Sequence, residues 1–497
     1  MIFNNELPVR LIIFLWGNKK MILKGYLFSV LYGALCLLMA AVLHKVGVPK
    51  KITRKLVHIF IGFEWVILYN FVGATYHFLA VCLAFLAMLI FVYKKRLMPM
   101  ISSEGDNAPG TVYYAVAMSV MATVTLFLPS MIVPFGIGVF CTSLGDGLAG
   151  LVGQSIPKKI NPKIYGSKSL AGGLTNLTVC FAVAMCFSEF FEMNVGILGC
   201  AAVAVFALEL ELFTAKGLDN ITITLGTAAL AFAFSYYPDV WNYIIPILLT
   251  PVIIAFVKSK RALTCGGLIS AVVLDVAISL TLGNSGFLIL SLFFAIGLIT
   301  DKIKKTADKK RQNQTAVDKS RGAVQVLSNG AVGMVCAVAF FLTSEKAFLI
   351  AFCASFAEAL ADTAASGIGA FSDKVFDPFR FKRCESGLSG GMSLIGTLAS
   401  LLGALLIALA SFALNLCSLS EMLVIVFSGF LGGVFDSLLG SLVQVKYRCN
   451  VCSKIIEKKV HCGENAEHYR GVKFVDNNLV NFLGTLFSAL VAVMFTV

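Results

Sequence analysis

The chain has 497 residues, of which 58% are hydrophobic and only 13% charged, and its mean hydropathy is +0.87. This composition excludes an ordinary soluble domain. The formal net charge of +13 does not indicate a nucleic-acid partner, because the basic residues alternate with apolar segments as in a polytopic membrane protein.

Apolar segments of spanning length recur from about residue 25 to the C-terminus. In hydrocarbon such segments must be helices, because their backbone groups find no other partners. We expect an all-α, polytopic integral membrane protein with about sixteen transmembrane helices in two tandem, distantly similar halves. The predicted spans are 25–43, 55–72, 76–93, 111–128, 131–153, 170–187, 195–213, 221–236, 240–257, 264–282, 285–300, 322–342, 346–370, 388–412, 420–443 and 477–496.

Lysine and arginine gather in alternate loops between these spans. Eight loops hold 35 of the 40 basic residues. The positive-inside rule then places these loops in the cytosol and both termini outside, in a cytoplasmic membrane or its equivalent. The eight loops are 44–55, 94–110, 154–169, 214–220, 258–263, 301–321, 371–386 and 444–475.

The N-terminal residues and the cysteines give little functional information. The apolar run Leu11–Trp16 is too short for a secretory signal peptide, so we predict none. Most of the fourteen cysteines lie inside apolar spans, where cysteine is a small packing residue. Their spacing does not resemble a secreted disulfide framework.

The first polar motifs lie at the cytosolic ends of early spans. In RKLVHIFIG, Arg54 and His58 are four residues apart and therefore share one helical face. Arg54 would clamp phosphate, and His58 is either a packed polar residue or a proton relay. The loop SSEGDNAPGT holds Asp106 and Asn107 among turn formers, so nucleotide contact and a bare turn both stay open.

Asp146 ends an otherwise apolar segment in SLGDGLAGLVG, seven residues before Gly153. An ionisable residue in a membrane span is costly. Its carboxylate suits Mg²⁺ facing nucleotide phosphates, and the alternative is a helix cap or a hydrogen-bonded structural carboxylate. The glycines Gly147, Gly150 and Gly153 would allow close backbone approach.

A basic loop, NPKIYGSKSLAGG, follows Asp146 and leads into the next span. Lys168 directly precedes the helix start that contains Gly172 and Gly173, and helix N-termini bind anions. We therefore expect Lys168 to contact phosphate.

The second half repeats this order of features. EALADTAASGIG carries an aspartate seven residues before a glycine, FKRCESGLSGG supplies a basic loop, and RGAVQVLSNG places an arginine and a glutamine four residues apart. The candidate site residues from these segments are Asp362, Arg383, Gly390, Gly391, Arg321, Gln325 and Asn329.

Each half closes its site region with an acidic residue near a span end and an Asp–Asn pair after it. In the first half these are Glu209 or Glu211 and the pair Asp219–Asn220; in the second they are Asp436 and the pair Asp476–Asn477. The pattern favours a tandem duplication with an insertion at 446–475. The predicted organisation is 1–44, an N-terminal segment with the first span; 45–240, a first membrane domain; 241–261, a connecting span and basic loop; and 262–497, a second membrane domain that carries the insertion.

The insertion holds Cys449, Cys452, His461 and Cys462, with His468 nearby. Thiolates and imidazole at such spacing suit structural zinc. Because His461 and Cys462 are adjacent, either His461 or His468 is open as the fourth ligand, and reduced free thiols are the alternative to a metal.

These motifs carry a family resemblance. The first half resembles the polyprenol kinase group that contains dolichol kinase and phytol kinase, through RKLVHIFIG, EGDNAPGTVYY, GDGLAGLVG, NPKIYGSKSLAGG and GLDN. The second half resembles the integral membrane family that includes phytyl-phosphate kinase, through RGAVQVLSNG, EALADTAASGIG, SGLSGGMSLIG, FDSLLGSLVQ and VDNNLVNFLG.

The resemblance implies a gene fusion with two consecutive kinase activities. CTP would phosphorylate an isoprenoid alcohol to its monophosphate and then to the diphosphate, with the lipid tail in the bilayer. Asp146 and Asp362 would hold Mg²⁺, Arg54, Lys168, Arg321 and Arg383 would neutralise phosphates, and the Asp–Asn pairs would complete metal or nucleotide contacts. Catalysis of this kind rests on positioning and charge neutralisation.

Two other classes of function stay open. Repeated halves with ionisable residues are also found in transporters, so a lipid transporter or flippase is one alternative. A CTP-dependent diacylglycerol kinase or a lipid cytidylyltransferase is the other.

Overall fold

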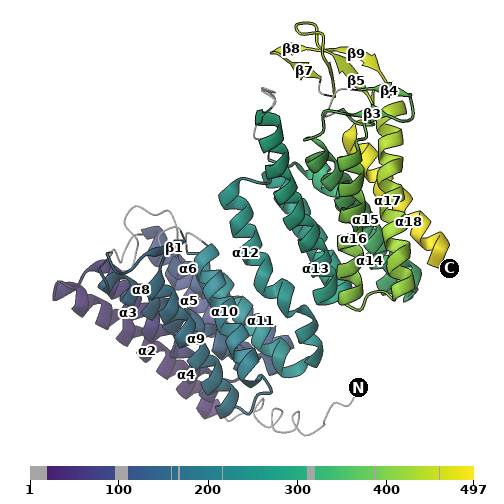
Figure 1. Ribbon diagram of the computed structural model, residues 1–497. Helices are drawn as coiled ribbons and strands as arrows, with labels where there is room; N and C mark the ends of the chain where they lie inside the picture. The colour runs from purple at the N-terminus through teal and green to yellow at the C-terminus, as the bar shows by residue number, and fades with distance from the viewer. Residues whose placement is uncertain are drawn as a thin grey trace. The chain divides into compact units, whose positions relative to one another are not determined.

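The computed structural model describes residues 19–95, 110–157, 159–165, 168–214, 217–310, 320–384, 388–457 and 459–496. Helices dominate, and the chain forms two compact units, Met1–Val252 and Ile253–Val497 (Figure 1). The boundary falls inside α12 (Ile244–Lys260), within the segment 241–261 that the sequence assigns to a connecting span.

The first unit consists of helices and one short hairpin. Its elements are α2 (Lys19–Lys45), α3 (Lys50–Ile61), α4 (Glu64–Phe71), α5 (Tyr76–Lys95), α6 (Gly110–Phe127), η1 (Pro129–Met131), α7 (Ile132–Phe140), η2 (Cys141–Asp146), α8 (Gly147–Ser155), β1 (Lys163–Tyr165), β2 (Lys168–Ser169), α9 (Leu170–Phe190), α10 (Gly196–Phe213), α11 (Asp219–Tyr236) and η3 (Pro238–Tyr243).

The segment that carries Asp146 lies at the centre of the first unit. In Pro129–Ser155, 72% of the most apolar window is buried, more than in any other candidate span of this unit. Around it, Trp65 packs against the rings of Phe140, Phe187 and Phe191. The core therefore holds the Asp146 segment against several helices at once.

The second unit contains longer helices and a small β module between its last two helices. Its helices are α13 (Cys265–Lys310), α14 (Ala323–Thr343), α15 (Lys346–Gly369), α16 (Leu394–Ala413), α17 (Leu419–Leu442) and α18 (Asn477–Thr496). Its strands are β3 (Phe376–Asp377), β4 (Lys382–Arg383), β5 (Lys446–Arg448), β6 (Ile455–Ile456), β7 (Val460–His461), β8 (Glu464–Asn465) and β9 (Glu467–Arg470).

Helix α13 is broken at Gly283, whose φ of 60° and ψ of −144° leave the helical region. Gly267 in the first arm approaches the carbonyl of Arg321, and Gly297 in the second arm accepts a hydrogen bond from the Arg321 guanidinium. Because both arms return to one residue, the chain reverses at Gly283. The two spans predicted at 264–282 and 285–300 thus occupy the two arms.

Helix α15, which carries Asp362, is the central helix of the second unit. It contacts α13, α14, α16, α17 and α18, and 78% of its most apolar window is buried. Alanines and other small residues cover much of its surface, which lets neighbouring helices approach closely. In both units the candidate metal-binding aspartate therefore lies on the most buried span.

The β module follows α17 and precedes α18. Strands β6, β5 and β9 form one antiparallel sheet in that order, and β7 pairs with β8 in a separate hairpin. All five strands are two to four residues long, too short to form a stable sheet without other support.

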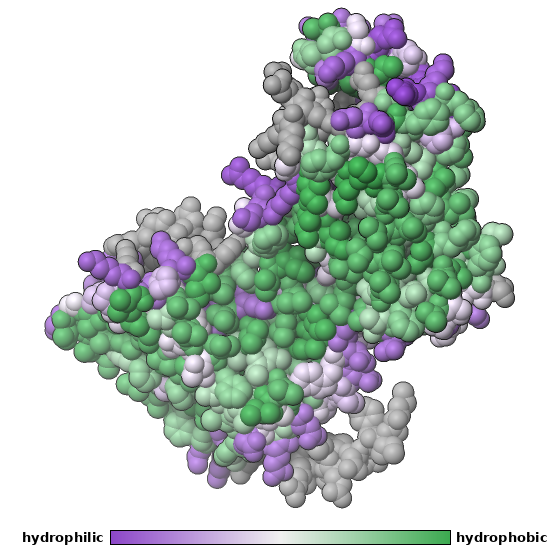
Figure 2. All heavy atoms as spheres, viewed as in Figure 1, coloured by the Kyte–Doolittle hydropathy of each residue, from purple (hydrophilic) through white to green (hydrophobic). Residues whose placement is uncertain are grey.

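Length and composition identify 13 helices in the described part of the chain as candidate membrane spans. The polytopic all-α prediction is therefore confirmed, but the count of sixteen is not. The span expected at 55–72 is divided into the short helices α3 and α4, and α11 is less apolar because it begins with Asp219 and Asn220. On the face shown in Figure 2, apolar residues cover the helices, while hydrophilic residues gather at helix ends and on the β module.

Candidate functional site

Asp146 lies at the end of a π-helical turn, Cys141–Asp146, between α7 and α8. The wider π turn displaces the chain from regular helical spacing and is frequent at functional sites. Only 5% of Asp146 is exposed. A Cβ on the preceding Gly145 would lie 2.5 Å from Cys180 Sγ, and one on Gly147 would lie 2.4 Å from Ile59. Glycine at both positions therefore lets α9 and α3 enclose this carboxylate.

Two side chains of α3 reach Asp146. Lys55 Nζ lies 2.6 Å from Oδ2 and also donates to the Asp146 carbonyl at 3.1 Å. His58 Nε2 lies 3.8 Å from the same Oδ2 and 3.2 Å from the carbonyl oxygen of Thr142. The motif RKLVHIFIG pointed to Arg54 and His58 as a pair, and Lys55 was not among the predicted residues. The spacing of three between Lys55 and His58 was the available signal, because residues three apart also share a helical face.

Lys168 joins three carboxylates. Its Nζ lies 3.0 Å from Glu211 Oε1, 3.7 Å from Asp219 Oδ2 and 4.0 Å from Asp146 Oδ1. Burial lowers the pKa of Lys168, but Glu211, Asp146 and Asp219 more than offset this, so its pKa lies above the usual value. Lys168 thus lies beside Asp146, although Glu211 is the partner with the shortest contact. The expected contact of Lys168 with phosphate stays a prediction.

The donor set around Lys168 fits a divalent cation. Three carboxylates face two lysines, and Glu211 Oε2 is buried without a hydrogen-bond partner among the described residues. Mg²⁺ prefers carboxylate oxygens together with phosphate and water. Asp146, Glu211 and Asp219 are therefore the residues of this unit that would hold it.

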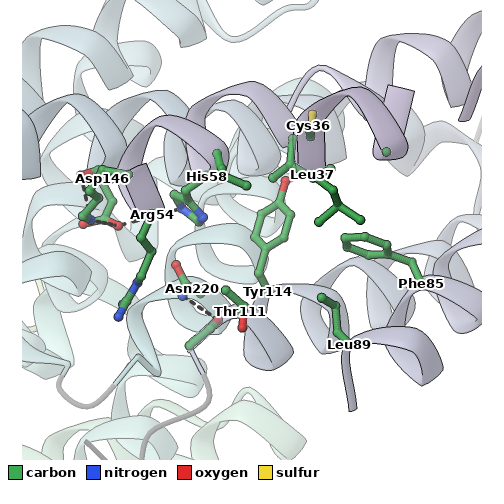
Figure 3. Close-up of a pocket in the computed structure, with 15 residues that line it drawn as sticks. Cys36, Leu37, Arg54, His58, Phe85, Leu89, Thr111, Tyr114, Asp146 and Asn220 are labelled. Atoms are coloured by element: carbon green, nitrogen blue, oxygen red, sulfur yellow. Dashed lines mark hydrogen bonds and ion pairs between the residues drawn. The ribbon is translucent and has the colours of Figure 1, made fainter. Parts of the chain in front are cut away.

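A pocket of about 720 Å³, part of it open to the surroundings, begins at Asp146. In Figure 3 the polar side chains of Arg54, His58, Asp146 and Asn220 lie at one end, and Cys36, Leu37, Phe85 and Leu89 lie toward the other. Lys55 and Ile61 also line the pocket. Figure 3 shows Tyr114 between the two ends. Such a pocket suits an amphiphile whose head group meets Asp146 and whose tail lies along Leu37, Phe85 and Leu89.

Two predicted residues border the polar end of the pocket. Asn220 Nδ2 donates to the carbonyl of Gly110 at 2.8 Å, which ties the start of α11 to the start of α6. Arg54 lines the same end, and a Cβ on Gly110 would lie 3.5 Å from its guanidinium. The Arg54 guanidinium is thus placed where an anionic ligand in the pocket could reach it. Asp106 and Asn107 lie outside the described residues.

The glycines predicted to face nucleotide take part in helix packing. A Cβ on Gly150 would lie 2.5 Å from the Lys55 side chain, so this glycine makes room for the lysine that binds Asp146. Gly153 and Gly172 bring α8 and α9 together, since a Cβ on Gly153 would lie 3.5 Å from Gly172 Cα. Gly173 faces Ile164 and Leu208.

The Gly153–Gly172 contact recurs inside the second unit. Gly369 packs on Gly396 as Gly153 packs on Gly172, and a serine caps the second helix in each case. Ser169 Oγ accepts from Gly172 N at 3.3 Å, and Ser393 Oγ accepts from Gly396 N at 3.1 Å. Helix contact therefore makes Gly396 the structural counterpart of Gly172, whereas the order of the motifs places Gly172 and Gly173 beside Gly390 and Gly391.

When the two units are aligned on these capping serines, Lys168 and Arg383 do not occupy equivalent positions. Lys168 directly precedes the capping Ser169, whereas Met392 directly precedes the capping Ser393. Arg383 is exposed on β4, where it pairs with Phe376 across the hairpin. Loop basicity alone could not reveal this shift, since both loops carry several cations.

Three carboxylates gather inside the second unit. Asp362 and Glu358 are four residues apart on α15, and both interact electrostatically with Asp436 of α17. Glu358 is only 1% exposed, and neither of its carboxylate oxygens has a partner among the described residues; the same holds for Asp436 Oδ2. A Cβ on Gly484 would lie 2.5 Å from Glu358 Oε1 and 3.4 Å from Asp436 Cβ. Glu358 was missed by the sequence analysis, although its spacing from Asp362 places both on one face.

A chain of hydrogen bonds connects other predicted residues of this unit. Ser389 Oγ donates to Asn477 Oδ1 at 3.3 Å, Asn477 Nδ2 to Asn481 Oδ1 at 3.1 Å, and Asn481 Nδ2 to Asn329 Oδ1 at 3.2 Å. Asn329 in turn donates to the Gln325 carbonyl at 3.1 Å. Helices α14 and α18 are thereby linked to the segment that contains Gly390 and Gly391.

Two other predicted residues have structural partners. Arg321 donates to Asp301 Oδ2 at 2.6 Å and stands between the arms of α13. Asp476 accepts from Leu479 N at 3.0 Å and from Asn478 Nδ2 at 3.3 Å, so it caps the start of α18. Neither contact joins these side chains to Glu358, Asp362 or Asp436.

The four cysteine–histidine ligands Cys449, Cys452, His461 and Cys462 converge in the β module, with their ligand atoms within 4.8 Å of one another. His468 is directed elsewhere, and its Nε2 lies 2.9 Å from the carbonyl oxygen of Gly471. Of the two histidines left open by the sequence, His461 is therefore the one in the cluster.

Comparison with known proteins decides the family. A phytol kinase from Synechocystis sp. is 33% identical over 196 residues, which make up 38% of this chain and 81% of that protein. The chain belongs to the phytol kinase family. The predicted resemblance to phytol kinase is thereby confirmed, and this relationship supports a prenyl-alcohol kinase-like function.

Further relatives agree with this assignment to the phytol kinase family. Residues 248–489 match the integral membrane protein family DUF92. Protein VTE6, chloroplastic, from Arabidopsis thaliana is 26% identical over 260 residues, or 51% of this chain and 69% of that protein. Protein PGR from Arabidopsis thaliana is 28% identical over 255 residues, or 43% of this chain and 87% of that protein. No solved structure matches the chain significantly.

Proposed function

We propose that the protein is a bifunctional isoprenoid lipid kinase. It transfers phosphate from CTP to an isoprenoid alcohol in the first unit and phosphorylates the resulting monophosphate in the second. The observation that carries the first step is the pocket that runs from Asp146 to Leu37, Phe85 and Leu89. It offers charged groups for a reacting head and an apolar wall for a long tail, as an isoprenoid alcohol requires.

The first transfer exchanges one phosphorus–oxygen bond for another. The alcohol oxygen forms a bond to the terminal phosphorus, the bond from that phosphorus to the bridging oxygen breaks, and its electron pair leaves with the nucleoside diphosphate. His58, within 3.8 Å of Asp146 and lining the pocket, would accept the hydroxyl proton. Arg54 and Lys55 would bind the phosphates.

Mg²⁺ held by Asp146, Glu211 and Asp219 would neutralise phosphate charge when bound. The ammonium groups of Lys55 and Lys168 would then be released from these carboxylates toward the nucleotide. Both lysines stand within 4.0 Å of Asp146, so a small side-chain movement suffices. Positioning and charge neutralisation of this kind are the main contributions of a protein to phosphoryl transfer.

The second transfer is assigned to Glu358, Asp362 and Asp436. Glu358 and Asp436 have carboxyl oxygens without hydrogen-bond partners among the described residues. The three side chains together would bind Mg²⁺ and thereby the charged substrates. The cytosolic orientation that the basic loops predict would expose both centres to the nucleotide pool.

The function is tested with purified full-length protein in lipid nanodiscs. CTP, ATP, GTP and UTP, each labelled in the γ-phosphate, are offered with geranylgeraniol, farnesol or phytol. We expect label in the monophosphate and later in the diphosphate, with CTP the best donor. Absence of labelled lipid with every nucleotide, from alcohol and from monophosphate, would refute the proposal.

The tail end of the pocket gives a prediction about specificity. Leu89→Trp should shorten the apolar end and raise KM for geranylgeraniol by about tenfold relative to farnesol, because an apolar pocket discriminates by the size it admits. KM values are measured for both alcohols. Leu83→Trp is the control, since Leu83 is exposed on the same helix α5 and does not line the pocket. Equal KM changes for the two alcohols would place the tail elsewhere.

Transport by the second unit is a second candidate function. Glu358 lies midway along α15, and buried ionisable residues inside membrane spans often mark ion or substrate pathways. Vesicles that contain the protein would then move prenyl phosphate between leaflets without consuming nucleotide.

A further inference from the structure

The ligand atoms of Cys449, Cys452, His461 and Cys462 have the spacing of a tetrahedral metal shell. His461 Nδ1 lies 3.4 Å from Cys452 Sγ and 3.1 Å from Cys462 Sγ. In a tetrahedral zinc site with ordinary Zn–S and Zn–N bond lengths, a sulfur ligand atom and a nitrogen ligand atom lie about 3.6 Å apart. All fourteen cysteines are free thiols, so no disulfide competes for this group.

Two tight turns bring the four ligands together. Cys449 follows β5, and Ser453 N donates to the Cys449 carbonyl at 2.9 Å, which closes the turn that also carries Cys452. In the opposite hairpin, Cys462 and Gly463 have φ values of 53° and 83°. These left-handed residues turn the chain so sharply that the adjacent His461 and Cys462 face one centre. Left-handed backbone at a non-glycine residue is costly and marks a position that its surroundings enforce.

The β module lacks the means to fold by itself. Its strands are two to four residues long, and Cys452 and Cys462 are exposed. Small elements without a core commonly require a metal or a disulfide. A bound metal would supply the missing stability, because structural zinc contributes its binding free energy to folding.

Two other side chains of the module, those of Glu457 and Lys446, bind the backbone of Ser389. Glu457 Oε1 accepts from Ser389 N at 2.6 Å, and Lys446 Nζ donates to Ser389 O at 2.6 Å. Lys446 is only 1% exposed. Both backbone polar groups of Ser389 are thus held by side chains of the module, while its hydroxyl continues the hydrogen-bond chain to Asn477.

We propose that Cys449, Cys452, His461 and Cys462 bind one Zn²⁺, and that this zinc clasps the β module so that Glu457 and Lys446 hold Ser389 in place. Glu457 also interacts electrostatically with Asp362 and Asp436. The zinc clasp therefore orders the polar border of the second carboxylate centre. It contributes no group to the first unit's pocket.

Metal content tests the site without reference to activity. Full-length protein purified without chelator is analysed for zinc and iron by mass spectrometry, and about one zinc per chain is expected. The double variant Cys449→Ser/Cys452→Ser should lose the zinc, and His461→Ala should lose most of it. His468→Ala and Cys265→Ser should keep it, since His468 bonds to Gly471 and Cys265 is exposed at the start of α13. Iron in place of zinc, or zinc retained in the double variant, would overturn the proposal.

Hydrogen exchange tests the clasp. In wild type the amide of Ser389 should be protected, and removal of zinc should abolish this protection while amides of α7 in the first unit stay unchanged. Unchanged exchange at Ser389 after zinc loss would refute the clasp. Zinc removal should also reduce phosphorylation of prenyl monophosphate, and this expectation rests on the proposed function. Zinc binding and Ser389 protection without any lipid phosphorylation would refute that function and leave the clasp standing.

Discussion

Asp146→Asn should reduce phosphorylation of the isoprenoid alcohol by more than about 100-fold. Asparagine keeps the size of the side chain but removes the charge that Lys55 contacts at 2.6 Å and Lys168 at 4.0 Å. The site would lose its central metal ligand and the group that positions both lysines. The measurement is the initial rate of monophosphate formation from geranylgeraniol at saturating nucleotide.

The matched control for Asp146→Asn is Asp239→Asn. Asp239 is exposed in η3 of the same unit, so its loss should leave the rate within about twofold of wild type. Thermal unfolding of both variants in nanodiscs checks that they are folded. A folded Asp146→Asn protein that retains more than a tenth of the wild-type rate would remove Asp146 from the reaction.

Glu358→Gln should have opposite effects on stability and on activity. Both oxygens of Glu358 are buried beside the acidic Asp362 and Asp436 and have no hydrogen-bond partner in the part of the chain that the structure describes, so the carboxylate costs stability in the folded protein. Glutamine relieves the repulsion at almost equal volume, and the melting temperature should rise. Phosphorylation of prenyl monophosphate should fall by more than about 100-fold, because the metal-binding centre loses a ligand.

Glu345→Gln is the control for Glu358→Gln on the same helix. Glu345 is exposed at the N-terminal end of α15 and makes no side-chain cap, so neither stability nor activity should change. A Glu358→Gln protein that is less stable yet fully active would show that this glutamate is a structural residue. Such an outcome would also remove the second metal centre from the account.

Much of the first site could be predicted from the sequence because each polar residue is costly in an apolar chain. Asp146, Lys168, Asp219 and Asn220 stand out for this reason, and the structure brings them together around one pocket or cluster. Lys55 did not stand out in the sequence. It lies at the end of a basic loop, where the positive-inside rule alone accounts for lysines. Its role depends on which helix faces α8, and that is a property of packing.

The remaining differences concern backbone geometry. The sequence left His461 and His468 open as the fourth ligand because His461 and Cys462 are adjacent, and the left-handed conformation at Cys462 lets these two neighbours face one point. Local motif similarity places Gly172 beside Gly390, whereas helix contact shows Gly396 as the structural counterpart. Glu358 lies in a run of small residues and was not predicted as a site residue. Its spacing of four residues from Asp362 could have indicated that both share one helical face.

Two consecutive catalytic centres in one chain are the central claim, and mixing two inactive variants tests it most directly. Asp146→Asn and Glu358→Gln proteins are placed in the same lipid vesicles with labelled geranylgeraniol and CTP. We predict no diphosphate from either variant alone and diphosphate from the mixture, because monophosphate made by Glu358→Gln reaches the intact second unit of Asp146→Asn. A mixture that forms no diphosphate, with each variant inactive on both alcohol and monophosphate, would contradict the account.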